Sequence, residues 1–498
     1  MIEGVEAARS ALAAGRPALV WRRQLADTET PVAAALKLIE PGRGDFLLES
    51  VEGGAVRGRH SLIGLAPDLV FRAVGAAAEV NRRWLTARDA FEPCEADSLT
   101  ALRSLVEACR ADVPPALPRA LACLVGYFGY ETIGLVEKLP SPKSRALDIP
   151  DMLFVRPTVL LVFDRLADAL FVVSPAWPEH GPQAVEQACE AIEATSARLA
   201  AAPLPAPARS DAEPPVFTPV LEPGRYGEMV AAAKEYIAAG DIFQVVLAQR
   251  FTAPFALPPI ELYRALRRIN PSPFLYHLDL PGFSLTGSSP EILVRVRDGE
   301  VTIRPIAGTR PRGNTPEADA ANRDSLLADP KERAEHLMLL DLGRNDVGRV
   351  ATAGSVRVTD SYTVERYSHV MHIVSNVIGK LHPDRDAIDA LFAGFPAGTV
   401  SGAPKVRACQ IIGELEPEAR GAYAGGVGYF SPDGSMDSCI VLRTGIVKDG
   451  VMHVQAGAGI VADSDPAYEQ RECEAKAGAL LAAAREAVAR AGEAGFGQ

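Results

Sequence analysis

Apolar runs bounded by turn-forming residues divide much of the chain into predicted β-strands. Asp-Gly pairs mark hairpin turns between several of them, for example Asp433-Gly434 and Asp449-Gly450. Runs of hairpins interrupted by helices are typical of an α+β fold, with antiparallel β-sheets packed against helices. We expect strands at residues 45–50, 59–64, 69–80, 120–130, 151–163, 169–173, 241–250, 274–280, 283–288, 291–297, 300–304, 355–360, 364–381, 425–430, 436–448 and 451–461.

Helical periodicity alternates with these strands. An Ala-rich helix is expected at residues 1–20, and a longer one at 466–491 ends the chain. A stretch rich in Pro and Ala at 203–223 resists packing into regular elements, which predicts a boundary between a domain at 1–215 and a domain at 216–498. Further helices are expected at 28–38, 98–109, 181–201, 226–239, 259–269 and from 384.

One more helix begins at Asp329 and carries acidic side chains in its first turns. Asp329 can cap the helix, and Pro330 suits its first position, where a missing N–H costs nothing. Glu332 and Glu335 stand three residues apart, so their carboxylates project from one face. Residues 337–342 are almost entirely apolar, which predicts a buried helix.

The C-terminal helix repeats this arrangement. It begins at Asp465-Pro466, and Glu469 and Glu472 again stand three residues apart. If the two helix starts converge, their four carboxylates would suit a hard cation such as Mg2+, whereas the chain has no zinc-binding pattern. The alternative is that the glutamates face water and favour the helix dipole.

Two glycine-containing segments resemble nucleotide-binding loops without matching them. Residues 457–462 fit the dinucleotide fingerprint, but too little chain follows for the βαβ unit it requires. Residues 397–405 end in Lys405 like a P-loop, yet Pro404 precedes the lysine and no Ser or Thr follows it. Two interpretations stay open: backbone N–H groups that bind a small carboxylate, or ordinary tight turns.

Several basic side chains near these segments are candidate ligand-binding groups. His372, near Tyr367, is a candidate general acid or a structural histidine. Arginine suits bidentate binding of carboxylates, although each candidate could equally form an ion pair. The candidates are Arg304, Arg310, Arg312 and Arg443. We find no cysteine in a nucleophile elbow, so we expect no glutaminase site in this chain.

Charge and composition narrow the setting. The formal net charge is -12 and no basic run compensates it, which argues against a nucleic-acid partner. The seven cysteines are scattered, without a C-x-x-C pair, as in a reducing compartment. No uncharged apolar run approaches the roughly 20 residues needed to span a bilayer, and the N-terminus is not a secretory signal. We therefore expect a cytoplasmic protein without a membrane partner.

Five segments together resemble the chorismate-utilising enzymes. They are residues 305–313 (Pro-Ile-Ala-Gly-Thr-Arg-Pro-Arg-Gly), 335–341 (Glu-His-Leu-Met-Leu-Leu-Asp), 343–346 (Gly-Arg-Asn-Asp), 398–405 (Gly-Thr-Val-Ser-Gly-Ala-Pro-Lys) and 455–459 (Gln-Ala-Gly-Ala-Gly). Leu-Leu-Glu-Ser at 47–50 and Arg-x-Ser-x-Ile-Gly at 59–64 extend the resemblance over roughly the whole chain. It implies an α/β sandwich of the type found in anthranilate synthases.

Two positions distinguish reactions within that family. The aminodeoxychorismate-forming members carry a lysine nucleophile where this chain has Ala307, and the isochorismate-forming members carry a lysine base where it has Gln244. Neither alanine nor an amide can play those roles. The resemblance is therefore to the anthranilate-forming branch, in which ammonia attacks chorismate directly and pyruvate is eliminated.

The resemblance implies specific residue roles. Mg2+ would be bound directly by Glu335 and Glu472, and through water by Glu332 and Glu469. His372 would be the general acid or base, with Glu335 and Thr399 also in the catalytic group. The substrate chorismate would contact Gly308, Thr309, Tyr423, Arg443, Gly457, Ala458 and Gly459.

The resemblance also implies partners and control. A separate glutamine amidotransferase subunit would supply ammonia, giving a hetero-oligomer, and tryptophan would inhibit the enzyme. The tryptophan site would comprise Leu48, Glu49, Ser50, Pro273, Phe274, Leu275, Val427 and Tyr429, with Glu49 pairing the amino group. The alternatives are an aminodeoxychorismate synthase component and a non-catalytic subunit that binds tryptophan.

Overall fold

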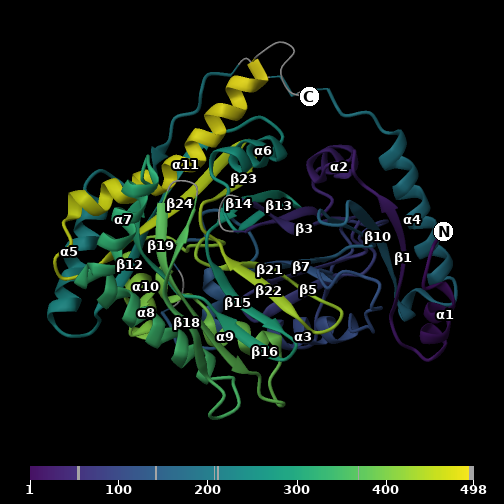
Figure 1. Cartoon of the computed structure of the whole chain (residues 1–498), viewed down its shortest axis with the longest axis horizontal. Helices are drawn as coiled ribbons and strands as arrows, with labels where there is room; N and C mark the ends of the chain where they lie inside the picture. The colour runs from purple at the N-terminus through teal and green to yellow at the C-terminus, as the bar shows by residue number, and fades with distance from the viewer. Residues whose placement is uncertain (53–55, 141–142, 207, 210–211, 368–369, 493–498) are drawn as a thin grey trace.

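Two antiparallel β-sheets form the body of the molecule (Figure 1). The structure is a computed structural model and describes residues 1–52, 56–140, 143–206, 208–209, 212–367 and 370–492. Within these ranges each sheet has 12 strands, and every pairing between them is antiparallel. The predicted α+β fold is confirmed.

The first sheet, called sheet A, joins strands from both ends of the chain. Its order is β1 (Ala18–Leu25), β10 (Ala169–Ala176), β9 (Val159–Asp164), β3 (Val56–Leu65), β2 (Asp45–Glu52), β13 (Phe274–Leu280), β14 (Phe283–Ser289), β23 (Thr444–Lys448), β24 (Val451–Ile460), β12 (Gln244–Pro254) and β11 (Thr218–Pro219), with β20 (Gly402–Ala403) paired to β12.

Sheet B likewise combines strands from both the N-terminal and the C-terminal parts of the chain. Its order is β17 (Ile306–Pro311), β19 (Val370–Lys380), β16 (Glu300–Ile303), β15 (Ile292–Arg297), β22 (Met436–Ile440), β21 (Gly426–Phe430), β7 (Leu124–Phe128), β8 (Met152–Arg156), β4 (Leu69–Val74), β5 (Ala77–Asn81) and β6 (Glu92–Pro93), with β18 (Arg357–Arg366) paired to β19.

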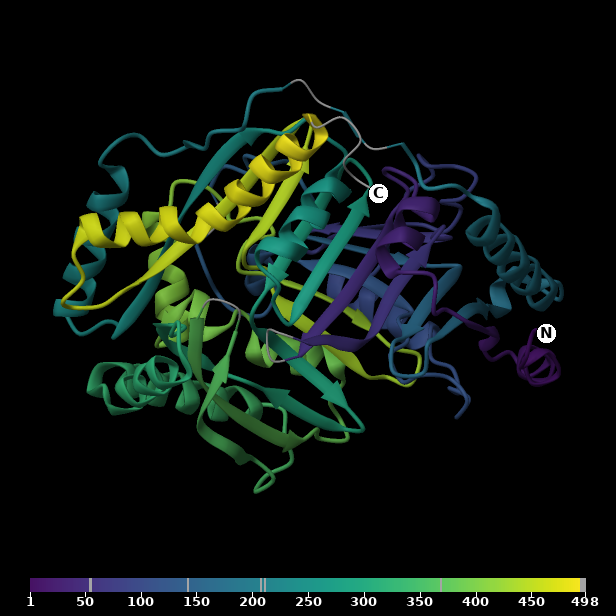
Figure 2. The same ribbon diagram turned by 45° about the horizontal axis from the view of Figure 1, so that its top comes forward.

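Apolar side chains from the two sheets meet in a shared core. Phe46 and Leu62 of sheet A belong to one buried cluster with Val125 and Tyr127 of sheet B. Helices cover the other faces, and α11 runs along the outside of β24 (Figure 2). The helices are α1 (Val5–Ala13), α2 (Pro31–Leu38), α3 (Ser98–Ala108), α4 (Ala184–Ala201), α5 (Arg225–Ala238), α6 (Pro259–Ile269), α7 (Pro316–Ala328), α8 (Pro330–Gly348), α9 (Ala387–Gly394), α10 (Lys405–Leu415) and α11 (Pro466–Gly492), with short 3-10 turns η1 (Tyr130–Leu135), η2 (Pro178–His180) and η3 (Gly398–Val400).

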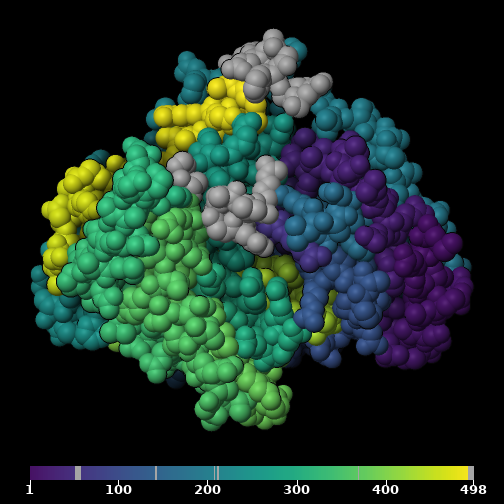
Figure 3. Space-filling model, in the orientation of Figure 1, coloured from purple at the N-terminus to yellow at the C-terminus, as the bar shows by residue number. Residues whose placement is uncertain are grey.

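Strands from both sides of residue 215 are hydrogen-bonded to each other in both sheets. In sheet A, β2 pairs with β13, and in sheet B, β7 pairs with β21. The space-filling view shows the early and later parts of the chain packed together across one face (Figure 3). The division at residue 215 stays a prediction about the chain, but each sheet is continuous across it.

Several predicted elements differ from the structure. The strands expected over 69–80, 151–163 and 436–448 are each two strands, and in the last two cases one strand lies in each sheet. The helix expected over residues 1–20 ends at Ala13, and β1 begins at Ala18, because the apolar run from Ala18 to Trp21 is buried in the sheet. The single strand expected over 364–381 is the end of β18 followed by β19, which pair as a hairpin. None of the helices in the described ranges is both long and apolar enough to cross a membrane.

Candidate active site

Helix α8 begins as predicted but is not buried all round. The Asp329 side chain accepts hydrogen bonds from the backbone N–H groups of Lys331 and Glu332, which caps the helix. Leu337 is half exposed and Asp341 lies in solvent, so the prediction of a buried helix is wrong. One side alone is buried, and it packs on β17 and β19 because sheet B covers only that side.

The first turns of α8 and α11 lie close together. Lys331 Nζ of α8 is 3.0 Å from Asp463 Oδ2, just before α11. Burial raises the pKa of Glu335, and the neighbouring Glu332 carboxylate raises it further. Burial likewise raises the pKa of Glu469, and Glu472 adds to the effect. Negative charge is therefore concentrated where the two helices begin.

Basic side chains partly neutralise this charge. Arg310 Nη1 is 2.8 Å from Glu332 Oε1, and Lys476 Nζ is 2.6 Å from Glu472 Oε1. Lys476 also donates a hydrogen bond of 2.9 Å to the Gly457 carbonyl. In this conformation the described residues contain no group of three His, Cys, Asp or Glu side chains arranged as a metal cluster.

The predicted substrate glycines near the end of the chain lie within β24, not in a turn. Gly459 faces Gln244, because a Cβ at Gly459 would lie 2.6 Å from Gln244 Nε2. A Cβ at Gly457 would lie 2.9 Å from the Tyr423 hydroxyl. Ala458, between them, is fully buried. Other side chains thus approach Gly457 and Gly459 so closely that a larger residue would not fit there. Because both glycines lie in a strand, the tight-turn interpretation is wrong here.

A second group of predicted residues meets on β17 and β19. Gly308 has φ +68°, which favours glycine, and a Cβ there would lie 3.0 Å from Glu332 Oε2. His372 Nδ1 is 2.8 Å from the Gly308 carbonyl and 3.2 Å from Thr309 Oγ1. Because a carbonyl only accepts, Nδ1 carries the proton and Nε2 is the acceptor. Burial lowers the pKa of His372, which favours this neutral form.

Arg443 differs from the other three candidate arginines. Arg304 pairs with Glu365, Arg310 with Asp329 and Glu332, and Arg312 with Asp319. Arg443 has no carboxylate of the described residues within ion-pair distance, and burial lowers its pKa. Its backbone is also held at φ +48°, which is uncommon for a residue other than glycine. A half-buried arginine without a carboxylate partner among the described residues is suited to an anionic ligand.

Glu291, at the start of β15, is a buried acid that the sequence pattern did not single out. Thr399 Oγ1 donates a hydrogen bond of 3.0 Å to Glu291 Oε2, so the acid lies beside a predicted catalytic residue. No salt bridge pairs Glu291 within the described residues, and burial raises its pKa to about 8. The carboxyl group therefore holds a proton near neutral pH.

The lysine of the P-loop-like segment has a structural partner. Lys405 Nζ is 2.8 Å from Asp346 Oδ2, and both side chains are buried. This ion pair joins the start of α10 to α8. The Lys405 ammonium is therefore already paired within the protein, in agreement with the rejection of a Walker motif.

A family model described as chorismate binding enzyme matches residues 56–482. The chain belongs to this family. Anthranilate synthase component 1 of Cereibacter sphaeroides is 50% identical over 493 residues, covering 97% of this chain and 98% of the relative. Anthranilate synthase component 1 of Thermus thermophilus is 46% identical over 468 residues, covering 93% of this chain and 97% of the relative.

Solved structures agree with this membership. Anthranilate synthase component I from Streptococcus pneumoniae TIGR4 is 35% identical, with a TM-score of 0.77, and the match covers 92% of this chain and 99% of that chain. The menaquinone-specific isochorismate synthase of Escherichia coli is 20% identical, with a TM-score of 0.69 over 97% of this chain and 100% of that chain. The second likeness shows the fold alone. The predicted resemblance to chorismate-utilising enzymes is confirmed.

In this chorismate binding enzyme, the β2 and β13 residues predicted to bind tryptophan divide between the two faces of sheet A. Ser50 is opposite Phe274, and Glu49 is opposite Leu275. Phe274 and Leu48 pack against the core between the sheets, to which Val427 and Tyr429 of sheet B also contribute. Leu275 belongs to the cluster on the outer face, and Glu49 shares that side because strand residues alternate. Pro273 precedes β13 and is half-buried.

Glu49 is already fully engaged in this structure. Its carboxylate is 2.5 Å from Arg267 Nε and 2.6 Å from Arg165 Nη2, and the Tyr263 hydroxyl donates to it at 2.6 Å. Burial alone would raise the pKa of Glu49, but Arg267 holds it below the usual value. The arrangement gives no support to the predicted pairing of Glu49 with an amino group.

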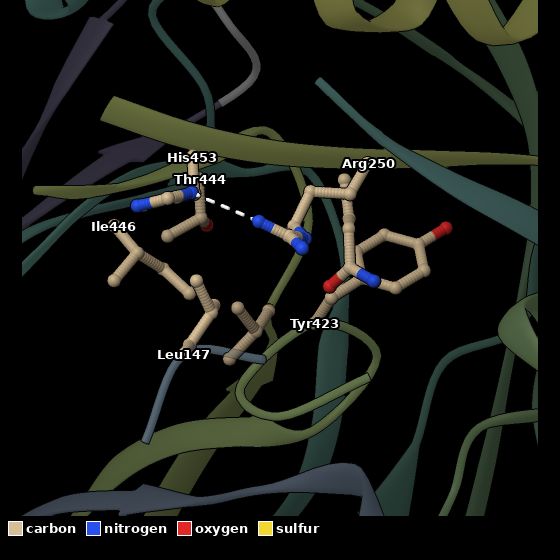
Figure 4. Close-up of a pocket in the computed structure, with 8 residues that line it drawn as sticks. Leu147, Arg250, Tyr423, Thr444, Ile446 and His453 are labelled. Atoms are coloured by element: carbon tan, nitrogen blue, oxygen red, sulfur yellow. Dashed lines mark hydrogen bonds between the residues drawn. The ribbon is translucent and has the colours of Figure 1, made fainter. Parts of the chain in front are cut away.

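A small cavity of about 10 Å³ lies beside Tyr423 (Figure 4). Arg250 Nη1 is 3.1 Å from His453 Nδ1 across it, and burial lowers the pKa of His453 to about 4. The cavity touches Tyr423 among the predicted substrate residues but contains none of the glutamates. It is too small for a ring substrate.

Proposed function

We propose that this chain forms anthranilate and pyruvate from chorismate and ammonia, the activity named for its relatives. The observation that carries the proposal is the absence of an amine at two positions of the site. Ala307 lies on β17 beside Gly308, and Gln244 lies on β12 against Gly459. Neither side chain can attack the ring or deprotonate water, which leaves ammonia as the nucleophile.

Arg443 is the proposed partner of a substrate carboxylate. Its guanidinium is largely buried and unpaired among the described carboxylates, so a bound anion would supply the missing charge. Tyr423, Gly457 and Gly459 would form the neighbouring wall, and Gly308 with Thr309 would close the other side. These groups would hold chorismate against His372.

Two side chains divide the proton transfers. Glu291 is protonated near neutral pH and would donate its proton to the C4 hydroxyl as the C4–O bond breaks and water leaves. Ammonia forms the new C–N bond at C2, and the resulting ammonium releases one proton to water. His372 Nε2 is an acceptor and would take the C2 proton as the enolpyruvyl C–O bond breaks, and the departing enolpyruvate takes up a proton from water at its methylene carbon to give pyruvate.

The glutamates fit a hard divalent cation. Their oxygen donors are of the type Mg2+ prefers, and burial, with a smaller contribution from the neighbouring carboxylates, raises the pKa values of Glu335 and Glu469, so that a cation would stabilise their charged forms. Glu335 and Glu472 would bind Mg2+ directly, with Glu332 and Glu469 behind them. When bound, the ion would supply positive charge against the ring carboxylate.

A separate glutamine amidotransferase subunit would deliver the ammonia. The seven cysteines are all free thiols, five of them buried, and we find none in a nucleophile elbow. The name "component 1" of the relatives also implies a second component. We expect turnover with ammonium salts but none with glutamine until that subunit is added.

The decisive test uses the purified chain with chorismate, Mg2+ and ammonium salt. We expect a fluorescent product with the mass and spectrum of anthranilate. Formation of 4-amino-4-deoxychorismate would instead identify an aminodeoxychorismate synthase. No product together with measurable tryptophan binding would identify a non-catalytic subunit.

Tryptophan is the proposed feedback inhibitor, bound between the sheets. Leu48, Phe274, Val427 and Tyr429 supply apolar surface on that side. Asp437 lies opposite Tyr429, and its Oδ1 is buried without a hydrogen-bond partner in the described part of the chain. Its Oδ2 is 3.0 Å from Arg295. Asp437, in place of Glu49, is therefore the carboxylate proposed to bind the amino group.

A further inference from the structure

Arg420 is a buried arginine whose guanidinium contacts three separate segments. Only 1% of the residue is exposed. Nη1 donates to the Val400 carbonyl at 2.8 Å, and Nη2 donates to the Val246 carbonyl at 2.7 Å. Nη2 and Nε also pair with Glu416, at 2.6 and 2.9 Å. With its donors satisfied inside the protein, Arg420 is not placed to bind a substrate itself.

The two carbonyl contacts each end beside a predicted site residue. Val400 directly follows Thr399, and Val246 is opposite Gly459 in the pairing of β12 with β24. The guanidinium also lies 5.6 Å from the centre of the Tyr423 ring. One side chain therefore adds a link among three segments that also contact one another, through the pairing of β12 with β24 and the hydrogen bond from the Val246 N–H to the Ser401 carbonyl.

A second anchor fixes the same loop from the N-terminal part of the chain. Glu131 of η1 accepts hydrogen bonds from the backbone N–H groups of Arg420, at 2.7 Å, and Gly421, at 3.0 Å. Tyr130 N–H donates to the Gly421 carbonyl at 2.8 Å. The Arg420 guanidinium lies over the Tyr130 ring at 4.7 Å. The loop before Tyr423 is thus held on both sides.

We propose that Arg420, supported by Glu131, is a positioning residue that sets Tyr423, Thr399 and Gly459 for substrate binding. The inference rests on the proposed function of these three residues. Arginine is required because a planar guanidinium reaches two carbonyls and a carboxylate at once, whereas a lysine ammonium is a point charge.

Substitution Arg420→Lys tests the proposal. A lysine keeps the positive charge that pairs with Glu416 but loses the hydrogen bond to at least one of the Val400 and Val246 carbonyls. The segments that carry Thr399 and Gly459 are then no longer held in the same alignment. We expect KM for chorismate to rise about tenfold, as when one charge-assisted hydrogen bond is lost, with a much smaller change in kcat. Calorimetry with chorismate and no ammonia should show the same loss in Kd. This binding measurement tests the positioning role even if the reaction product is not anthranilate.

Arg156→Lys is a matched control. Arg156 is buried, makes two hydrogen bonds to Asp68 and lies 4.5 Å from the Trp177 ring, but it contacts none of the predicted substrate segments. We expect both variants to lower the melting temperature, and only Arg420→Lys to weaken chorismate binding. Tyr423→Phe combined with Arg420→Lys should cost less than the sum of the two single changes.

Glu131→Gln provides a second variant in case Arg420→Lys does not fold. Its amide oxygen can accept only one of the two backbone N–H groups, so a smaller loss in chorismate Kd is expected. If Arg420→Lys or Glu131→Gln lowers stability like Arg156→Lys while Kd and KM stay unchanged, the positioning role is overturned. Failure of the wild-type chain to make anthranilate would overturn the proposed function instead.

Discussion

The candidate active site and the proposed tryptophan site differ in how their charged groups are compensated. In the active site, the half-buried Arg443 and the buried Glu291 have no ion-pair partners among the described residues. At the tryptophan site, Glu49 is held by Arg267, Arg165 and Tyr263. In the first region His372 contacts Gly308 and Thr309, and Tyr423 lies beside Gly457, whereas the β2 and β13 residues of the second region divide between the two faces of sheet A.

This difference shows which charged residues are available to a ligand. Burying a charge without a partner is costly, so a protein retains such a group where a ligand or a reaction requires it. The charge of a fully paired carboxylate such as Glu49 is already compensated within the protein, so it does not require a ligand. Asp437 meets this criterion in part: its Oδ1 is buried without a hydrogen-bond partner among the described residues, while its Oδ2 pairs with Arg295 and Arg297. Four predictions test the comparison.

The largest effect is expected for Glu335→Gln and Glu472→Gln. An amide lacks the charge proposed to bind Mg2+, so each variant should lose Mg2+-dependent turnover by about a hundredfold or more. Anthranilate fluorescence at increasing Mg2+ measures this. Asp341→Asn is the control, because Asp341 is exposed on the same helix and pairs only with Arg344. Normal activity in either glutamine variant would remove that residue from the metal site.

Glu291→Gln should lower kcat by about a hundredfold, the usual contribution of general acid catalysis. Because burial raises the pKa of Glu291 to about 8, the donor form predominates below that pH and declines above it. The rate of the wild-type enzyme should therefore fall as pH rises beyond about 8. That alkaline limb should be absent from the variant. A variant with full kcat would show that Glu291 is not the acid.

Arg443→Lys should weaken chorismate binding by about tenfold, because lysine cannot make the bidentate contact of a guanidinium. Calorimetry without ammonia measures this directly. Arg407→Lys is a matched control, since Arg407 is paired with Asp241 and Glu414 at the surface. If both variants bind chorismate like the wild type, Arg443 does not contact the substrate.

At the tryptophan site, Asp437→Asn should raise the tryptophan concentration for half-inhibition by about tenfold, through loss of one charge-assisted hydrogen bond. Ser50→Ala should have a smaller effect in the same direction. Glu49→Gln should lower the melting temperature, because Arg267 and Arg165 would lose their partner, with little change in inhibition. Strong resistance to tryptophan in Glu49→Gln alone would reverse the assignment.

Much of the fold follows from local pattern. Asp329 caps α8 as predicted, and α11 extends from Pro466 to Gly492, one residue beyond the predicted end. The prediction of a helix over 1–20 is wrong because alanines favour a helix locally, whereas burial in sheet A decides the structure from Ala18 onward. A short apolar run alone does not separate these two outcomes.

The site residues show a similar limit. Family motifs bring His372 to Thr309, and Tyr423 to Gly457, as the resemblance implies. Glu291 was missed because Ser-Pro-Glu at 289–291 gives no sign that the carboxyl group is buried without a cation. The engagement of Glu49 with Arg267 and Arg165 could not be predicted either, because it depends on the pairing of β2 with β13. Both facts depend on long-range pairing.

Both sheets combine strands from distant parts of the chain, which has a consequence for synthesis on the ribosome. When residues 1–215 have emerged, β2 still lacks its neighbour β13 (Phe274–Leu280), and β7 lacks β21 (Gly426–Phe430). Both strands then present open hydrogen-bonding edges, which are prone to pair with other chains. A truncated product would keep those edges open permanently. Nearly the whole polypeptide must therefore be made before either sheet is complete, and nascent chains depend on protection from aggregation until then.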